Sequence, residues 1–526
     1  MMTKRSDQTK QNFIKGAMIL LAAGLINRLL GFAPRIALPR IMGAEGVGLY
    51  QLSYPFLTVM ITLITGGIPL AVAKWIAEAE SQGDTTRVKY IFRTAMGLVI
   101  SLGILLTALM VIFAPWITKH VLPDSRVYNT FMVMTPMLLI IGISSVYRGY
   151  FQGKQNMIPT AVSQIVETLL RIIASLSFSF MLLPYGLEWA AAGAMLGAVV
   201  GEIGGLAVLL WKYYRDKSRI KHNALSQSSQ KAAKNVPVLR KLLSLSIPVT
   251  GSRLVGSFSY LLESILTVRS LAAAGITTGI ATAQYGALQG MIIPLLLLPT
   301  ALTYSLAVSL VPSLSEAAAR GDHALIHKRL HQSMRLALVS GAPFVVIMAL
   351  LAEPICRIVY NHAEIAPMLQ LIAPVGIFIY LQAPLQAALQ ALNKPGTALI
   401  NTLIGAVVKL FLIVQLASNA DFGIYGALIA INVNIVLVTL LHGISVLRFI
   451  GFHMKLLDFV KVGTAMIIMG AAARFTMNHE PLSIEWVNLL LACAASVIIY
   501  LILMIVMKII DRHDMARVPL FGAWFK

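Results

Sequence analysis

Three arginines near the start of the chain occupy an apolar stretch, and their chemistry suits the binding of a phosphate. Arg28, Arg35 and Arg40 lie in NRLLGFAPRIALPRIMG, residues 27–43. An arginine at the centre of a membrane helix costs roughly 2.5–3.5 kcal/mol on insertion scales, which makes a functional role the first expectation. A guanidinium donates paired hydrogen bonds to phosphate oxygens and stays charged when it loses water. We predict that Arg28 faces a polar cavity, the alternative being a structural ion pair, and that Arg35 and Arg40 either line this cavity or reach the outer interface.

A second set of charged residues lies in and just beyond the apolar stretch at 242–267. It consists of Arg253, Glu263 and Arg269. Arg253 and Arg269 are predicted to face the same cavity as Arg28. Together the arginines make the cavity net cationic, which suits a pyrophosphate and argues against a cationic cargo. Glu263 is a candidate for ion coupling or gating.

Four further charged residues within apolar stretches are coupling or gating candidates. Glu167 and Arg171 are four residues apart, so they share a helix face and can pair. Glu202 is either a site for a coupling ion or a carboxyl that is hydrogen-bonded in packing. Lys409 has no acid four residues before it, because position 405 is a glycine. The glycines around Glu202 recur every four residues and predict close helix packing; they are Gly193, Gly197, Gly201 and Gly205.

No pattern in the chain indicates catalysis or a resident cofactor. HExxH, GxSxG, GxxxxGK[ST] and CxxC are all missing from the sequence. His323, His327 and His331 recur every four residues, but on a basic stretch that is typical of a helix near anionic headgroups. We therefore predict no catalytic residues, no metal site and no cofactor; a coupling ion is left open.

The composition is that of a membrane protein. Of the 526 residues 58% are hydrophobic and only 12% are charged, with a mean hydropathy of +0.80. A bilayer is crossed by about 20 apolar residues in a helix. The fold class predicted is therefore an all-α polytopic membrane protein with about fourteen transmembrane helices. The apolar stretches are 13–36, 51–76, 93–115, 129–151, 157–183, 187–211, 242–267, 284–311, 334–356, 365–390, 397–417, 423–447, 457–475 and 486–509.

The distribution of basic residues predicts the orientation. With both termini inside, 31 of the 42 Lys and Arg residues fall on the inner side and seven on the outer side. This count places Arg148, Lys154 and Lys394 in short inner turns. The positive-inside rule then predicts a multi-pass protein of the bacterial plasma membrane with both termini cytoplasmic. The net charge of +21 is explained by topology, so no nucleic-acid partner is expected.

The two halves of the chain resemble each other at a separation of 238 residues. GYFQGKQNMIPTA (149–161) matches AALQALNKPGTA (387–398), and Gly83-Asp84 matches Gly321-Asp322. The repeat unit contains six spans, which predicts two six-helix lobes related by a pseudo-two-fold axis along the membrane normal. The predicted parts are an N-terminal lobe at 1–211, a basic cytoplasmic linker at 212–241, a C-terminal lobe at 242–447, and two further helices with a cytoplasmic tail at 448–526.

Four segments carry a resemblance to a known family. NRLLGFAPRIALPRIMGAEGVGLYQLSYP, LLESILTVRSLAAAG, SLVPSLSEAAARGD and QALNKPGTALI resemble SpoVB-like polysaccharide transporters. That family includes relatives of the lipid II flippase MurJ, within the MATE-like multidrug/oligosaccharidyl-lipid/polysaccharide exporter superfamily. Arg28, after the polar Asn27, matches the cavity arginine of the lipid II flippases. Arg40 matches the basic residue before the glycine that ends their first helix.

The resemblance implies a flippase without enzymatic activity. It implies alternating access and transfer of an undecaprenyl-pyrophosphate-linked saccharide, such as lipid II, from the inner to the outer leaflet, in the setting of spore peptidoglycan. The expected partners are the lipid-linked oligosaccharide, membrane lipids and, as a candidate class, peptidoglycan synthases. Two alternatives are a cation-coupled multidrug exporter, which would need an acidic cavity, and a membrane scaffold for peptidoglycan synthesis, which would need no cavity arginine.

Overall fold

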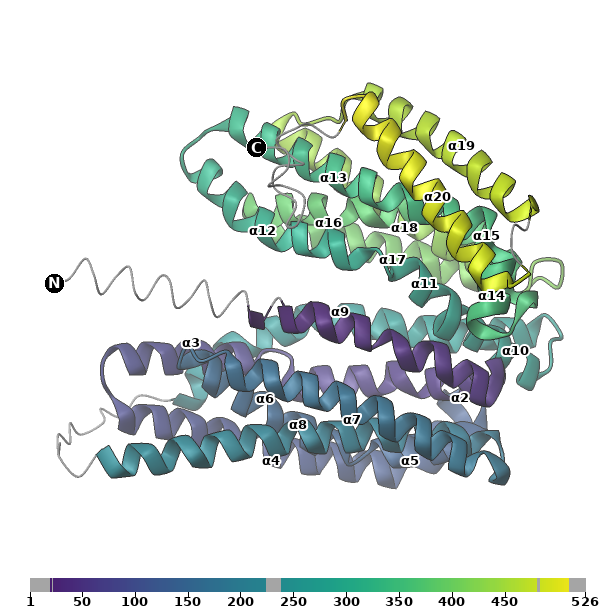
Figure 1. Cartoon of the computed structure of the whole chain (residues 1–526). Helices are drawn as coiled ribbons and strands as arrows, with labels where there is room; N and C mark the ends of the chain where they lie inside the picture. The colour runs from purple at the N-terminus through teal and green to yellow at the C-terminus, as the bar shows by residue number, and fades with distance from the viewer. Residues whose placement is uncertain (1–18, 21, 224–237, 480–482, 510–526) are drawn as a thin grey trace. The chain divides into compact units, whose positions relative to one another are not determined.

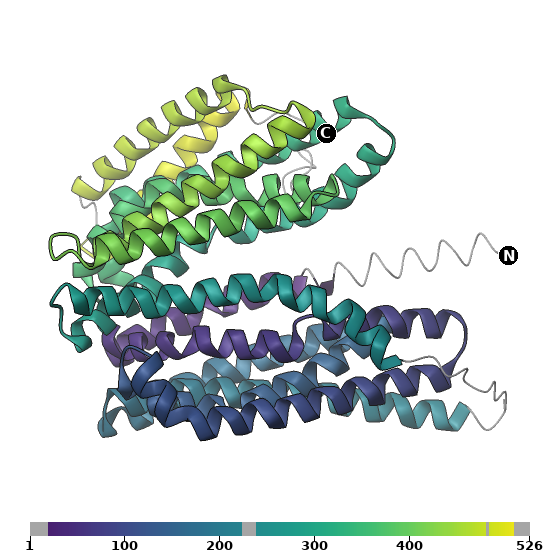
Figure 2. The same ribbon diagram turned by 180° about the vertical axis from the view of Figure 1, so that it is seen from behind.

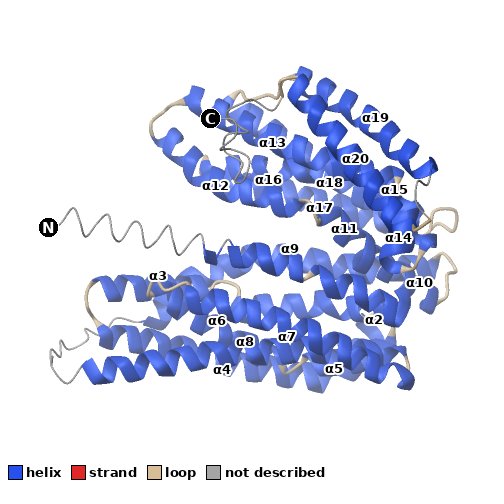
Figure 3. Cartoon of the chain, in the orientation of Figure 1, coloured by secondary structure: helices blue, strands red, loops and turns tan. Residues whose placement is uncertain are grey.

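The computed structural model describes residues 19–20, 22–223, 238–479 and 483–509, and every regular element in these ranges is a helix (Figures 1 and 3). Packing divides the chain into two compact units, 1–290 and 291–526. The first unit contains α2 (Phe32–Thr65), α3 (Ile68–Ser81), α4 (Thr85–Trp116), η1 (Ile117–Val121), η2 (Ser125–Val127), α5 (Tyr128–Met134), α6 (Met137–Gly153), α7 (Ile158–Leu182), η3 (Leu183–Tyr185), α8 (Leu187–Asn223), α9 (Val238–Ala273) and α10 (Thr278–Gly286). The π-helical η5 (Ala287–Ile292) spans the boundary.

The second unit is also helical throughout its described residues. It contains α11 (Ile293–Leu297), α12 (Thr300–Ala319), α13 (His323–Leu350), α14 (Ala352–Tyr360), η6 (Ala363–Ile365), α15 (Ala366–Ile372), η7 (Ala373–Val375), α16 (Gly376–Ala391), α17 (Pro395–Ala417), α18 (Ile424–Ile450), α19 (Leu456–His479) and α20 (Glu485–Val506). Its buried core is apolar, and two buried tyrosines anchor helices to it. Tyr380 donates to the Leu296 carbonyl at 2.9 Å, and Tyr500 donates to the Val339 carbonyl at 3.0 Å.

Twelve helical runs in the described residues are long and apolar enough to cross a membrane. The first of these, Ala22–Ser81, has 60 residues, about 90 Å of helix, which is far more than one crossing of about 30 Å needs. It holds the first two predicted spans. The predicted seventh span corresponds to α9, which is not among the twelve. The prediction of an all-helical protein with about fourteen spans is confirmed.

A glycine divides the 60-residue run into two helices. Gly43 has φ 66° and ψ −178°, a conformation that essentially only glycine adopts. Residues 22–42 therefore form one helix, and α2 continues as a second helix from residue 44. Gly43 is the glycine that the sequence places three residues after Arg40, at the end of the first helix. The first helix thus carries all three N-terminal arginines.

The 238-residue repeat is visible in the bounds and the turns of the helices. α4 and α13 begin at Thr85 and His323, and α5 and α15 cover positions that are 238 residues apart. Asp84 caps α4 by accepting from the Arg87 amide, and Asp322 caps α13 by accepting from the Leu325 amide. The glycines before these caps have φ values of 70° and 68°. Equivalent elements therefore recur in both units.

The predicted domain boundaries differ from the boundary between the two packing units. α9 and α10 pack against α2 within the first unit, although the sequence repeat assigns them to the second half (Figure 2). Of the predicted linker at 212–241, residues up to Asn223 continue α8, whereas 224–237 lie outside the described residues. The division at 211 and 242 stays a prediction about the repeat.

Candidate functional site

The five arginines of the predicted cavity all lie in the first unit. Arg28, Arg35 and Arg40 project from the first helix, and Arg253 and Arg269 project from α9; all five have exposed side chains. Arg28 and Arg35 are seven residues apart, so they lie about 20° from alignment and about 10 Å apart along the helix. The Gly31 amide donates to the Asn27 carbonyl at 2.8 Å, which keeps this helix continuous between them. Two cationic side chains therefore share one helix face.

Small polar residues bring α9 and α2 together. The hydroxyls of Thr62 and Ser257 are 2.9 Å apart, and the Gly67 amide donates to the Thr250 hydroxyl at 3.1 Å. Side-chain hydrogen bonds of this kind join membrane helices without a hydrophobic driving force. Arg35 lies within electrostatic reach of the Tyr260 hydroxyl on α9. The arginine face of the first helix and the polar face of α9 therefore share one region of the unit.

Arg269 has a defined partner at one end of α9. Its guanidinium donates to the carbonyls of His120 and, at 3.0 Å, Val121, both in the π-helical turn η1. The last carbonyls of a helix carry partial negative charge and have no partner within the helix, so an arginine there is stabilised. This contact holds α9 against the end of α4, and Arg269 stays a candidate for cargo binding through its remaining donors.

A second group of polar side chains lies near the same end of α4. Arg126 binds Glu45 at 2.7 Å and Asp124 at 2.8 Å, and Asp124 also accepts from the Thr282 hydroxyl at 2.9 Å. Burial favours the neutral form of Asp124, but the hydrogen bonds from Arg126 and Thr282 outweigh it and hold the pKa of Asp124 below its usual value. These side chains connect the loop before α5 to α2 and α10 through ion pairs and a hydrogen bond.

Glu263 is buried on α9 and has an amide partner. Gln289 of η5 donates to its Oε1 at 2.8 Å, and the Gln51 side chain of α2 contacts the Gln289 carbonyl at 3.4 Å. Three elements of the unit therefore meet at this carboxyl. Glu263 remains a coupling or gating candidate.

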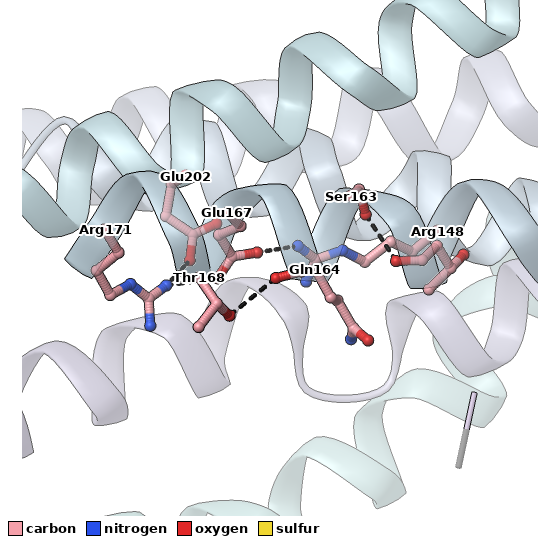
Figure 4. Close-up of polar contacts among 8 residues, drawn as sticks. Arg148, Ser163, Gln164, Glu167, Thr168, Arg171 and Glu202 are labelled. Carbon is pink, nitrogen blue, oxygen red and sulfur yellow. Dashed lines mark hydrogen bonds and ion pairs between the residues drawn. The ribbon is translucent and has the colours of Figure 1, made fainter. Parts of the chain in front are cut away.

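The remaining candidates of the first unit form, together with Arg148, an ionic cluster across three helices. Arg148 (α6), Glu167 and Arg171 (α7) and Glu202 (α8) lie in a row, shown in Figure 4. Arg148 binds Glu167 Oε2 at 2.6 Å, and Arg171 binds Glu167 Oε1 within α7, as the four-residue spacing predicts. Arg171 also binds Glu202 Oε1 of α8 at 3.0 Å. These four residues are referred to below as the ionic cluster.

The glycine stripe of α8 makes this cluster possible. A Cβ at Gly201 or Gly205 would meet the backbone or side chain of Glu167, and one at Gly197 would meet the backbone of Ser175. The close approach that the stripe allows brings Glu202 into contact with α7. The reading of these glycines as packing residues is therefore supported.

The structure corrects the position of Arg148. The sequence places it in an inner turn, but it lies inside α6, which continues to Gly153. There it is one of only two cations bound to a buried carboxylate of the cluster within the described residues. Arg148 lies 19 residues before Glu167 on a different helix, and no spacing rule links residues of different helices, so the sequence did not indicate this pair.

Lys409 has a different environment from Arg171, its repeat equivalent. It is half-buried on α17, next to a face of α17 that is neutral and polar. Asn401 on this helix donates to the hydroxyl of Ser445 at 3.0 Å and contacts His442 at 3.1 Å, both on α18. Lys409 stays a candidate; it belongs to the second unit, and the ionic cluster belongs to the first.

The helical architecture defines an integral membrane protein with a transporter fold. The solved structure of the lipid II flippase MurJ in an inward closed conformation superposes with a TM-score of 0.68 at 16% identity, over 93% of this chain and 99% of that chain. An inward-facing MATE-family multidrug resistance transporter gives a TM-score of 0.61 at 14% identity, over 81% of this chain and 94% of that chain. At sequence identities this low, the similarity to these two structures shows a shared fold alone.

The chain belongs to the polysaccharide biosynthesis protein family, which matches residues 13–317. Stage V sporulation protein B of Bacillus subtilis (strain 168) is 40% identical over 98% of this chain and 99% of that protein. The lipid II flippase MurJ of the same organism is 27% identical over 87% of this chain and 86% of that protein. The predicted family is confirmed, and the prediction of a membrane protein without enzymatic activity agrees with these relatives.

Proposed function

We propose that this protein is an alternating-access flippase for an undecaprenyl-pyrophosphate-linked saccharide, which it moves from the inner to the outer leaflet of the bacterial plasma membrane. Its similarity along the whole chain to a sporulation protein supports a role in spore peptidoglycan, with lipid II or a related precursor as cargo. The similarity to a lipid II flippase supports the flippase activity. Both termini are proposed to be cytoplasmic, from the distribution of basic residues.

The observation that carries the proposal is the set of exposed arginines on the first helix and α9. A pyrophosphate brings two or more negative charges, and the transfer of unpaired charge into a medium of low dielectric is prohibitive. Arg28, Arg35 and Arg253 provide guanidiniums that pair with such a group in a bidentate way. Arg40 and Arg269, nearer one end of their helices, serve in this scheme as exit positions. A cationic site of this kind does not suit the cationic cargo of a multidrug exporter.

The test is transfer of defined lipid-linked precursors in proteoliposomes, measured by accessibility at the outer leaflet. Arg28→Ala is expected to abolish transfer, and Arg28→Lys to restore only part, because an ammonium lacks the paired donors of a guanidinium. The matched control is Arg320→Ala, which removes an exposed arginine that caps the C-terminal end of α12 in the second unit and pairs with Glu316. Normal transfer by Arg28→Ala would contradict the proposed site.

The same assay separates the alternatives. A panel that contains lipid II, other undecaprenyl-pyrophosphate saccharides and a cationic dye identifies the cargo. Transport of the dye alone would indicate a multidrug exporter. A wild-type protein that moves none of them but binds peptidoglycan synthases would indicate a scaffold, and synthases would then be its principal partners.

A further inference from the structure

We propose that Glu202 is a proton-binding site, and that a proton on this carboxyl loosens the contact between α7 and α8. The proton-binding part of this proposal rests on the ionic cluster alone. The coupling part, in which proton binding is linked to transport, rests on the proposed flippase function. The proton would then be the ion whose gradient contributes to transport.

Glu202 is the less neutralised of the two carboxylates in the ionic cluster. Glu167 accepts from two guanidiniums, Arg148 and Arg171, one at each oxygen. Among the residues that the structure describes, Glu202 accepts only from Arg171, through Oε1. Its other oxygen, Oε2, is buried without a hydrogen-bond partner in the described part of the chain, and the side chain is only 7% exposed. A carboxylate oxygen that has lost water and gained no donor is the favoured place for a proton.

The second carboxylate strengthens this preference. Glu167 Oε1 and Glu202 Oε1 both bind the same Nη2 atom of Arg171, so the two acids are immediate neighbours. Glu202 also lies within hydrogen-bond reach of the Glu167 carboxyl. Two adjacent carboxylates in a low dielectric repel each other, and one shared proton relieves that repulsion. The proton adds to Glu202 Oε2, and the new O–H becomes a donor for Glu167.

The charges around the cluster favour a proton over a metal cation. With both acids ionised, the cluster contains two positive and two negative groups and is formally neutral. The groups that face Glu202 are Glu167 and Arg171 of α7 and Arg148 of α6. A metal ion needs several oxygen ligands, and the nearest carboxylate already spends its oxygens on arginines. A proton needs one lone pair, which Glu202 Oε2 has.

Protonation changes what holds α8 against α7. With Glu202 ionised, Arg171 makes a charged bond in each direction, to its own helix and to α8. With Glu202 neutral, the bond across the helices joins the guanidinium to an uncharged carboxyl, whereas the bond within α7 remains an ion pair. Arg171 is 32% exposed and lies within electrostatic reach of Tyr50 and Tyr54 of α2.

The first experiment measures protonation without transport. A hydrophobic carbodiimide reacts with protonated carboxyls, and peptide mapping locates the modified residue in the full-length protein in liposomes. Glu202 is expected to be modified at neutral pH, with the yield falling as pH rises. Glu188, on the same helix but outside the cluster, is the internal comparison. Modification of Glu167 instead of Glu202, or no change in Glu202 modification with pH, would overturn the proton site.

The second experiment measures coupling. Transfer of lipid II is compared with and without an imposed pH gradient while the membrane potential is clamped at zero. The wild type is expected to respond to the gradient; in Glu202→Gln the ratio of the two rates falls to unity, whereas Glu188→Gln keeps the wild-type ratio. A response to sodium but not to pH overturns the inference. If Glu202 titrates but no precursor is moved, the proposed function fails and the proton site stands.

If Glu202→Gln does not fold, the proton site is tested with Glu202→Asp, because this variant keeps the carboxyl group on a shorter side chain. A shifted pH dependence of modification and transfer supports the proton site. A pH dependence identical to that of the wild type assigns the titration to another group and overturns it.

Discussion

The α7–α8 pair of the first unit and the α17–α18 pair of the second occupy equivalent places in the repeat, yet they pack in opposite ways. In the first unit the large residue is Glu167 on α7, and glycines on α8 make room for it. In the second unit the residue at the position of Glu167 is Gly405, and Val438 and Asn434 of α18 lie against it. At this position the repeat keeps the closeness of the helices and exchanges which helix provides the small residue, whereas further along Gly426 of α18 lies against the α17 backbone.

This exchange has a consequence for charge. The first pair contains an ionic cluster, whereas the second is joined by the neutral group of Asn401, His442 and Ser445. Charged groups are costly to bury, so a neutral pair suffices where only packing is needed. The second pair contains Lys409 and His442 but has Gly405 at the position of the buried carboxylate Glu167, which indicates that the two repeats have divided their tasks.

The largest expected effect tests whether the ionic cluster stabilises the first unit. Glu167→Gln leaves Arg148 and Arg171 with one anion between them, so the free energy of unfolding should fall by about 3–5 kcal/mol. Thermal unfolding in detergent measures this. The control is Glu316→Gln, which removes an exposed pair with the same four-residue spacing and should change stability by less than about 0.5 kcal/mol. Equal effects would mean that burial of the cluster is unimportant.

The next effect tests the glycine stripe. In Gly197→Ala the added methyl would overlap the backbone of Ser175 on α7, and overpacking of this kind should cost about 2 kcal/mol. Gly443→Ala on α18 meets no atom within 4 Å and should stabilise by a few tenths to about 1 kcal/mol through helix propensity. Thermal unfolding of both variants gives the difference, and a destabilised Gly443→Ala would contradict the assigned asymmetry.

A third prediction concerns acid sensitivity in the loop before α5. Asp124 has a pKa below its usual value, so its contribution is present above the unfolded-state pKa of about 3.9 and is lost as pH falls through the native value. Asp124→Asn should therefore cost about 1.5 kcal/mol near neutral pH and progressively less below about pH 4. At the repeat-equivalent position stands His362, paired with Glu364 at 2.5 Å. His362→Asn should cost less than about 1 kcal/mol near neutral pH, because this pair is largely exposed, and unfolding followed across pH for both variants decides it.

The smallest effect should be the same in both units. Asp84→Ala and Asp322→Ala each remove one N-cap hydrogen bond, and each should cost about 1 kcal/mol. Hydrogen exchange of the first turn of α4 and α13 measures the local loss. Unequal losses would show that the two caps, despite matching backbone angles, have different surroundings.

The sequence predicts the helices better than it predicts the cluster. Hydropathy and the 238-residue repeat suffice for the spans and the caps, because these depend on residues close in the chain. The pair of Glu167 and Arg171 follows from helical spacing in the same way. The addition of Arg148 and Glu202 depends on how three helices rotate about their axes, which local patterns do not determine. The glycine at 201, beside Glu202, was the indication that this face meets another helix.

The backbone at Gly43 restricts how this protein can change over evolutionary time. Almost every position in a membrane helix accepts several apolar residues, but a side chain at a φ of 66° and a ψ of −178° is strained whatever its size. The glycine at this junction is therefore expected to be nearly fixed even while the flanking apolar residues drift. In a saturation library scored for function, position 43 should tolerate fewer substitutions than its apolar neighbours, although a Cβ there would meet no atom within 4 Å.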